Sequence, residues 1–519
     1  MKRLFWLATL ACAAALSSCS SGGTTVPTPT PTGGFSLSSL KGQYAYSMSG
    51  LDAGGYYISR VGSFSADGAG NISSAMEDVV DLGAGSAAEV SFTGGSYSVQ
   101  ANGRGVIVLQ AGSGNGLQLT MILQSSSQGY LLETDGNSGT SGNFILQTVA
   151  DFATTALSGN YVFDFSGVSL TGATPTNVST VGYIAATGNG IITGGLNDIN
   201  DGNAGISGPV TIAPGTFTLD PINGTTFGRG TAQFAGHTFA FYIVDNTQVR
   251  CIQEDAQGGS TGDAVLQTGA IPTQNTGFSG GFAYLVGGSS TLGPDASVAR
   301  FTSDGSGDIN AISYDENNYG TPLHIAQGSN ISNATYAIDT TNAGSGRGTL
   351  TFSDSTSGLT LQYVFYLASP TSGVIQETTS GYVADGSLFA QTGAPFTLAN
   401  LAGNYAFSWS GVNVVSGNPE NYVGQYVLAS STSNNISGVM DATSLGIDGV
   451  SSYPDGGAQG TLTINSTSSS NNDTYQIVAG SPISATYNFQ AYIADANTVL
   501  LIGTANNRVL AGFVSRQSQ

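Results

Sequence analysis

Two kinds of side chain that could form a binding site recur at matching places along the chain. An arginine between two glycines occurs three times, as Arg104, Arg229 and Arg347. An acid follows a matched strand-like segment four times, as Asp78, Asp198, Asp315 and Asp441. Because a guanidinium offers several donors in a fixed fork, each arginine could bind a carboxylate or a sugar of a ligand. The alternative is that each arginine pairs with a local acid, for which Asp78, Asp198 and Asp315 are candidates, while the flanking glycines form a β-bulge.

Oxygen-bearing side chains cluster in glycine-rich loops. The aspartates are Asp198 and Asp201 in NDINDGNAG, Asp304 and Asp308 in DGSGD, and Asp315 in YDENNYG. Carboxylate oxygens are the ligands that Ca²⁺ prefers, so one interpretation is a calcium site at these five residues, with calcium as the only cofactor suggested. The spacing of an EF-hand loop is absent. The other interpretation is turn formation, since Asp and Asn side chains accept hydrogen bonds from nearby backbone.

The side chains most often used in catalysis are scarce. The two histidines, His237 and His324, lie at different places in different parts of the chain. Cys251 is the only cysteine after residue 19, and it lies in a strand-like run typical of a buried apolar position. Glu133, Glu254 and Glu377 recur late in three of the copies and could act as glycosidase carboxylates paired with the recurring aspartates. Such a mechanism would need a catalytic pair duplicated in three places. We therefore expect a protein that is not an enzyme.

The chemistry recurs because the chain contains four copies of one segment. The copies open with LKGQYAYSMSG, LSGNYVFDFSG, FSGGFAYLVGG and LAGNYAFSWSG, whose glycines Gly42, Gly159, Gly280 and Gly403 lie 117, 121 and 123 residues apart. Matching segments further along each copy keep the same order, and the first three copies close on LQT, LQT and AQT. The fourth copy lacks Gly-Arg-Gly. We expect four tandem β domains of about 120 residues each, at 35–149, 150–270, 271–394 and 395–519.

Each copy reads as an antiparallel β meander. Apolar residues alternate with polar ones, and Gly, Asn and Asp turns recur roughly every 10 to 15 residues, which predicts seven or eight strands. Short hairpins favour an all-β, up-and-down barrel, and a β-sandwich is the alternative. The opening Gly-x-Tyr before the meander faintly resembles avidin-like and lipocalin-like barrels. This resemblance implies a closed barrel, but no ligand residue of those families is matched.

The first 34 residues predict export and anchoring. Lys2 and Arg3 precede an apolar run at 4–16, which is too short to span a membrane and typical of a signal peptide. The sequence Leu16-Ser17-Ser18-Cys19 resembles the lipobox of bacterial lipoproteins. That resemblance implies a signal peptide at 1–18, lipidation of Cys19 and, because serine follows the cysteine, an outer-membrane location. A Ser/Gly/Thr/Pro tether follows at 19–34; the alternative is an ordinary cleaved signal.

The composition argues against two classes of partner. Only 8% of residues are charged, and without Lys2 and Arg3 nine basic residues face 32 acidic ones. Such an acid excess argues against nucleic acid and against electrostatic binding to anionic lipid.

We therefore expect a non-enzymatic, lipid-anchored protein of the bacterial cell envelope, with the membrane as a partner through Cys19. Its repeated domains would serve surface binding, adhesion or spacing, with a glycan or a protein as the ligand. The alternatives are a small-ligand-binding barrel protein and an extracellular hydrolase acting on polysaccharide.

Overall fold

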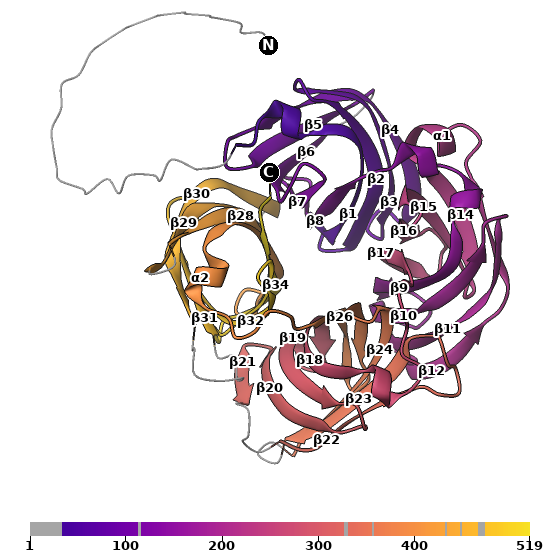
Figure 1. The fold of residues 1–519 in the computed structure, drawn as a ribbon. Helices are drawn as coiled ribbons and strands as arrows, with labels where there is room; N and C mark the ends of the chain where they lie inside the picture. Colours follow the sequence, from indigo (N-terminus) through magenta and orange to yellow (C-terminus); the bar gives the residue numbers. More distant parts are fainter. Residues whose placement is uncertain are drawn as a thin grey trace, which may run out of the picture. The chain divides into compact units, whose positions relative to one another are not determined.

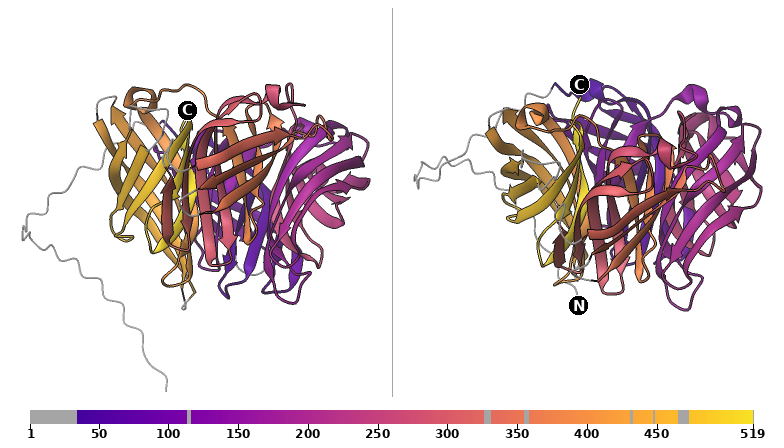
Figure 2. Two further views of the ribbon diagram at one scale, coloured as in Figure 1. Left: turned by 90° about the horizontal axis from the view of Figure 1, so that it is seen from below. Right: turned by 60° about the horizontal axis from the view of Figure 1, so that its bottom comes forward.

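The computed structural model describes residues 34–112, 116–325, 331–354, 358–430, 433–446, 449–464 and 473–518. The predicted signal peptide and Cys19 lie outside them. The described residues belong to one compact body of 34 strands and a few short helices (Figures 1 and 2). None of these helices is long and apolar enough to cross a membrane. We name four repeats by their strands: β1–β8, β9–β17, β18–β26 and β27–β34.

Repeats 1 and 4 are closed antiparallel barrels of eight strands. Repeat 1 contains β1 (Lys41–Asp52), β2 (Tyr57–Asp67), β3 (Asn71–Asp81), β4 (Ser86–Val99), β5 (Arg104–Ala111), β6 (Leu117–Leu123), β7 (Gln128–Glu133) and β8 (Ser138–Leu146). Repeat 4 contains β27 (Gly403–Asn413), β28 (Asn418–Ser430), β29 (Ser433–Gly446), β30 (Gly449–Thr463), β31 (Asp473–Ala479), β32 (Thr486–Asp495), β33 (Thr498–Gly503) and β34 (Arg508–Arg516). Each strand pairs with the next and the last with the first, which confirms the predicted up-and-down barrel.

Repeat 2 is also closed, by pairing of β10 with β11. Its strands are β9 (Ser158–Ser169), β10 (Thr176–Thr187), β11 (Ile191–Asp201), β12 (Gly205–Ile212), β13 (Gly215–Leu219), β14 (Arg229–Phe234), β15 (His237–Asp245), β16 (Gln248–Gln253) and β17 (Gly258–Leu266). Where repeat 1 has the single strand β4, repeat 2 has β12 and β13 with Pro214 between them. Proline lacks the N–H that a ladder requires, which explains the interruption.

Repeat 3 is a half-barrel, an open sheet that ends at β21 and β22. Its strands are β18 (Ser279–Ser290), β19 (Gly293–Asp304), β20 (Ile309–Asn318), β21 (Thr321–Ile325), β22 (Ile331–Ile338), β23 (Arg347–Asp354), β24 (Thr360–Ser369), β25 (Ser372–Glu377) and β26 (Tyr382–Ala390). An isolated bridge joins Asp308 to Thr335 across part of the opening.

Short helical turns connect the sheets or lie beside them. They are η1 (Leu37–Ser39), η2 (Val149–Asp151), η3 (Thr154–Ala156), η4 (Asn275–Gly277), α1 (Gly224–Phe227) and α2 (Leu398–Leu401).

The interior of each repeat is filled largely by aromatic side chains on the inward face of the strands. The ring of Tyr44 stacks on Phe64 in repeat 1, and Phe407 stacks on Trp409 in repeat 4, with centroids 5.4 and 4.2 Å apart. The tyrosine or phenylalanine that follows each opening glycine is buried, as its alternation predicts; these residues are Tyr44, Tyr161, Phe282 and Tyr405.

Candidate functional site

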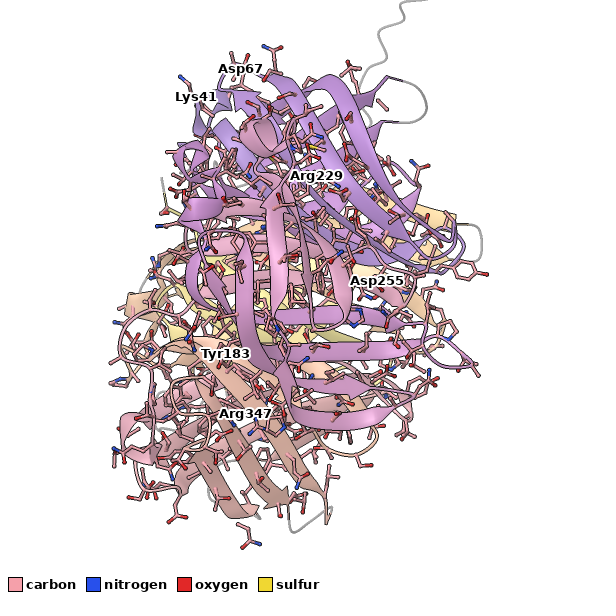
Figure 3. All side chains as sticks on the ribbon, turned by 90° about the vertical axis from the view of Figure 1, so that its right-hand side faces the viewer. Lys41, Asp67, Tyr183, Arg229, Asp255 and Arg347 are labelled. Carbon is pink, nitrogen blue, oxygen red and sulfur yellow. The ribbon has the colours of Figure 1, made fainter. Side chains whose placement is uncertain are left out.

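The three Gly-Arg-Gly segments each begin a strand that faces a neighbouring repeat. The first residues of β5, β14 and β23 are Arg104, Arg229 and Arg347, respectively. Figure 3 labels Arg229 and Arg347. The glycine before Arg229 has a φ of 71°, a turn conformation that glycine adopts without strain. The glycine after it, Gly230, lies so close to the Phe241 ring that a Cβ would come within 2.4 Å. The glycines thus shape a turn and a close approach, rather than the bulge that the alternative interpretation supposed.

Arg229 of repeat 2 binds Asp78 of repeat 1 through two parallel hydrogen bonds. The distances are 2.8 Å from Nε and 2.7 Å from Nη2 to the two carboxylate oxygens. Tyr242 donates a third hydrogen bond to Asp78, at 2.7 Å. Burial alone would lower the pKa of Arg229, but the Asp78 carboxylate outweighs it and raises that pKa. Burial and the same carboxylate raise the pKa of Tyr242, so its hydroxyl remains a donor.

The same arrangement joins repeats 2 and 3. Arg347 donates from Nε and Nη2 to the two oxygens of Asp198, each at 2.8 Å, and Tyr366 donates to Asp198 at 2.6 Å. Arg347 also approaches Asp339 of its own repeat at 3.4 Å. The sequence predicts that these arginines pair with local acids such as Asp78 and Asp198. Both aspartates do pair with an arginine, but each arginine reaches the acid of the preceding repeat rather than a local one.

Arg104 closes the series by binding the last repeat. Its Nε and Nη2 donate to Asp441 of repeat 4 at 2.8 and 2.6 Å, across 337 positions of sequence. Where repeats 2 and 3 have the interface tyrosine, repeat 1 has Ile122, which packs against Val423 of repeat 4. The same kind of pair therefore joins repeats 1 and 2, repeats 2 and 3, and repeats 4 and 1.

The interface between repeats 3 and 4 has no arginine of this kind, because repeat 4 lacks Gly-Arg-Gly. Asp315 instead accepts a hydrogen bond from Tyr492 of repeat 4 and lies 2.8 Å from Nδ1 of His324 in its own repeat. The hydrogen bond with Asp315 raises the pKa of His324. Protonated, this histidine supplies the cation that the arginine supplies at the other three interfaces. The contacts between repeats therefore form a cycle: 1 with 2, 2 with 3, 3 with 4, and 4 with 1.

A glutamine near the end of every repeat completes each interface. The side-chain amides of Gln147, Gln267, Gln391 and Gln517 donate to backbone carbonyls of the next repeat in the cycle. Gln517 donates to Leu123 of repeat 1 at 2.6 Å. The residue after each glutamine adds a backbone hydrogen bond, as Ser518 does to the Gln124 carbonyl. Three of these glutamines lie in the recurring closing segments LQT and AQT, whereas Gln517 lies in the segment RQS, and recurrence alone assigns none of them a role.

Apolar clusters surround all four sets of polar contacts. One example contains Val61 and Val80 of repeat 1 with Ala240 and Ile252 of repeat 2. The other three interfaces have clusters of the same kind. Strands that face a neighbouring repeat are therefore buried on both sides. One cavity of about 650 Å³ is lined by residues from all four repeats.

The aspartates considered for calcium lie in different surroundings. Asp198 and Asp315 belong to interfaces, as described. Asp201 accepts hydrogen bonds from the backbone of Asn203 and Ala204, and Asp304 accepts them from three amides of its own turn, including that of Asp308. These bonds lower the pKa of Asp304. Among the described residues, no three His, Cys, Asp or Glu side chains group closely enough to hold a metal ion. Calcium binding stays a prediction.

The acids considered for catalysis do not form one recurring set. In repeat 1, Glu77 and Glu133 both bind Arg60, at 2.7 and 3.3 Å, inside the barrel. In the strand register, the position of repeat 1 that holds Glu133 is occupied in repeat 2 by Gln253. Glu254 therefore lies one residue beyond the position that corresponds to Glu133.

Comparisons with known proteins assign no family. No family model matches the chain, and no curated protein matches it. Among solved structures, a variant of the vaccine antigen transferrin-binding protein B from Haemophilus parasuis is 10% identical, over 75% of this chain and 82% of that one, with a TM-score of 0.18. Transferrin-binding protein B from serogroup B Neisseria meningitidis is 11% identical over 76% and 85%, with a TM-score of 0.18. A putative AttH from Nitrosomonas europaea is 10% identical over 72% and 98%, with a TM-score of 0.15. The similarity is distant, and TM-scores this low support no argument about fold or function.

Proposed function

We propose that this chain is a non-enzymatic, lipid-anchored protein of the bacterial cell envelope, whose four β repeats form one rigid scaffold for surface binding, adhesion or spacing. The observation that carries the proposal is the cycle of four buried interfaces with recurring Asp, Arg and Gln contacts. Arg104 and Arg229 are only 7% and 6% exposed, and their guanidinium groups are occupied by aspartates. These side chains therefore hold the repeats together rather than present themselves to a ligand.

A scaffold of this kind suits the predicted anchor. Two or more acyl chains on Cys19 would hold stably in a bilayer, at ~0.8 kcal/mol per buried CH₂. The tether at 19–34 would then separate the folded body from the membrane surface.

The anchor is tested by labelling. In a bacterial host fed radiolabelled palmitate, we expect label on the chain and its recovery with the membrane fraction. Cys19→Ala should abolish both, whereas the matched change Cys12→Ala, within the predicted signal peptide, should leave both intact. Unlabelled wild-type chain, or label that survives Cys19→Ala, would contradict the proposal.

A second function, binding of a small ligand inside a barrel, is favoured by one observation. The interior of repeat 2 contains a cavity of about 250 Å³. Lining by polar and aromatic side chains distinguishes it from a simple packing defect.

A further inference from the structure

The cavity inside repeat 2 exists because short side chains stand where other repeats have long ones. Thr180 lines it from β10, one position before the buried Val181. The matching position of repeat 1 is Arg60, which extends between two glutamates, and that of repeat 4 is Tyr422, which packs against Trp409. The chain itself thus supplies two examples of how this space is filled.

Repeat 3 has the short Ser297 at the same position, but its neighbours are larger. Tyr314 stands where repeat 2 has Asn197, and its ring lies 5.4 Å from Phe352. Tyr363 stands where repeat 2 has Phe239. Repeat 2 therefore combines two short residues, Thr180 and Asn197, that no other repeat combines.

The cavity borders a groove on the outside of the barrel. The groove has a volume of about 930 Å³, and five residues line both spaces: Asn197, Ile199, Phe234, Ala235 and His237. The interruption of the strand at Pro214 explains why the cavity and the groove meet, because β13 pairs with β14 only from Thr216 to Leu219. The turn at the end of β14 is left without a partner strand on that side, so the interior can communicate with the surface.

The lining combines aromatic faces with hydrogen-bonding groups. Phe163 stacks on Phe165 and Phe234 on Phe239, with centroids 4.8 and 4.7 Å apart. Asn197 is 2% exposed, and its Oδ1 has no hydrogen-bond partner. A buried acceptor of this kind requires a donor.

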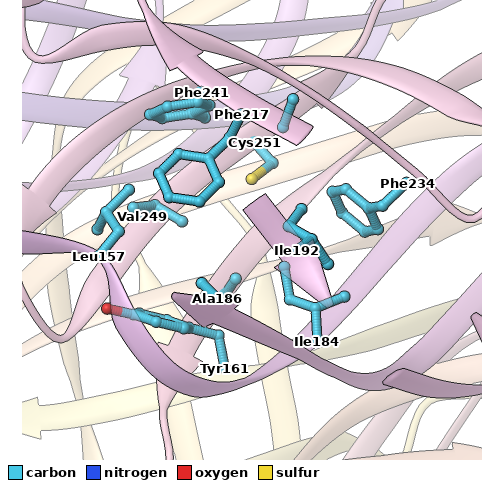
Figure 4. A pocket seen from close by; sticks show the side chains of 12 residues that line it. Leu157, Tyr161, Ile184, Ala186, Ile192, Phe217, Phe234, Phe241, Val249 and Cys251 are labelled. Carbon is cyan, nitrogen blue, oxygen red and sulfur yellow. The ribbon is translucent and has the colours of Figure 1, made fainter. Parts of the chain in front are cut away.

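Several other polar side chains of the cavity are held by hydrogen bonds. Gln253 donates to His237 and Asp255 and accepts from Ser260. The Asp201 carboxylate is engaged by backbone amides. A second, smaller space inside repeat 2, of about 40 Å³, is apolar and is lined by Cys251 and other interior side chains of this repeat (Figure 4). Burial raises the pKa of the Cys251 thiol, so it offers no reactive thiolate to either space.

We propose that the cavity of repeat 2 binds one neutral sugar ring, as the terminal residue of a glycan whose next residue lies in the outer groove. The C–H groups of a sugar suit the negative faces of the phenylalanine rings, and its hydroxyls can donate to Asn197 and bond with His237. No Lys or Arg lines the cavity, which disfavours an anionic ligand. The cavity volume of about 250 Å³ lies just below the ~300–1,000 Å³ typical of pockets for drug-sized ligands, which suits a ligand as small as one ring. This inference deepens the binding part of the proposed function and rests on it.

The test uses the full chain, purified in detergent, and a panel of methyl glycosides of neutral hexoses and N-acetylhexosamines, with binding measured by ligand-observed NMR and calorimetry. We expect saturable binding of at least one glycoside. Thr180→Tyr, which copies the tyrosine of repeat 4, should weaken it at least tenfold, whereas Thr180→Val should leave it within about twofold.

Asn197→Met, which copies repeat 4, provides a second variant and should also weaken binding at least tenfold. Circular dichroism and thermal melts check that each variant folds. The absence of saturable binding by any glycoside, or equal binding by Thr180→Tyr, would overturn the proposal. So would stronger binding of choline or benzoate than of every glycoside. Neither result bears on palmitate labelling at Cys19, so the two proposals can fail separately.

Discussion

At the scale of single residues, three of the four interfaces contain a buried arginine–aspartate pair whose carboxylate is fully hydrogen-bonded. Asp78 is completely buried and accepts hydrogen bonds from an arginine and a tyrosine of another repeat. Such a pair contributes little compared with apolar residues of the same size, but removing one partner leaves an uncompensated buried charge. The pair therefore selects which surfaces meet, since a mismatched interface would bury a lone carboxylate.

This argument predicts the effect of breaking one pair. Arg229→Met should lower the free energy of unfolding by about 3–5 kcal/mol, because Asp78 would remain buried with only Tyr242 as a partner. The double variant Arg229→Met with Asp78→Leu should recover most of that loss. Urea denaturation measures all three proteins, and a loss of less than about 0.5 kcal/mol for Arg229→Met would contradict the account.

At the scale of strands and sheets, repeat 3 combines an open edge with buried acids. Asp295 of β19 and Glu377 of β25 are 2% and 0% exposed, and none of their carboxylate oxygens has a hydrogen-bond partner. Burial raises the pKa of Glu377 to about 8. Burial, with the charges of Glu316 and Glu377, raises the pKa of Asp295 to about 9.

The pH dependence follows from these shifts. In the unfolded chain such carboxyls ionise near pH 4, whereas in the folded chain Glu377 and Asp295 keep their protons to about pH 8 and 9. Their contribution to stability is therefore complete below about pH 4 and is lost as the pH rises toward about 9. The raised pKa of His324 acts in the same direction.

We expect thermal melts to show a lower transition temperature at pH 9 than at pH 6. Glu377→Gln should reduce that difference. Asp67→Asn should not, because hydrogen bonds, first from the Asn71 side chain, lower the pKa of this exposed acid and keep it ionised across the range. A transition temperature that rises between pH 6 and pH 9 would contradict the assignment.

The sequence predicts many features of the strands and sheets, but not all of them. Alternation and glycine turns predicted four meanders, because a half-buried strand has a period of two residues. The repeat to which the partner of Arg229 or Arg347 belongs cannot be predicted, since an acid that recurs in every copy gives no information about which copy an arginine reaches. The cavity of repeat 2 depends on short side chains at Thr180 and Asn197, where other repeats have longer ones, and periodicity does not encode side-chain size.

At the scale of the whole molecule, the four repeats depend on one another. Gln517 lies near the end of the chain yet bonds to Leu123 and Asn102 of repeat 1. Arg104 bonds to Asp441 at the same interface. The cycle is therefore completed only when the last repeat meets the first, which makes that interface the most informative one to test.

The most direct measurement is a cross-link between repeats 1 and 4. Ser141 of β8 and Asn421 of β28 lie 280 positions apart, with Oγ and Oδ1 3.0 Å from each other. In the double variant Ser141→Cys with Asn421→Cys, we expect a disulfide to form under mild oxidation in the folded chain. The control pair, Ser141→Cys with the exposed Thr474→Cys of β31, should not cross-link. Efficient cross-linking of the first pair alone is the result that the closed cycle predicts, and failure of that pair to cross-link in folded protein would contradict it.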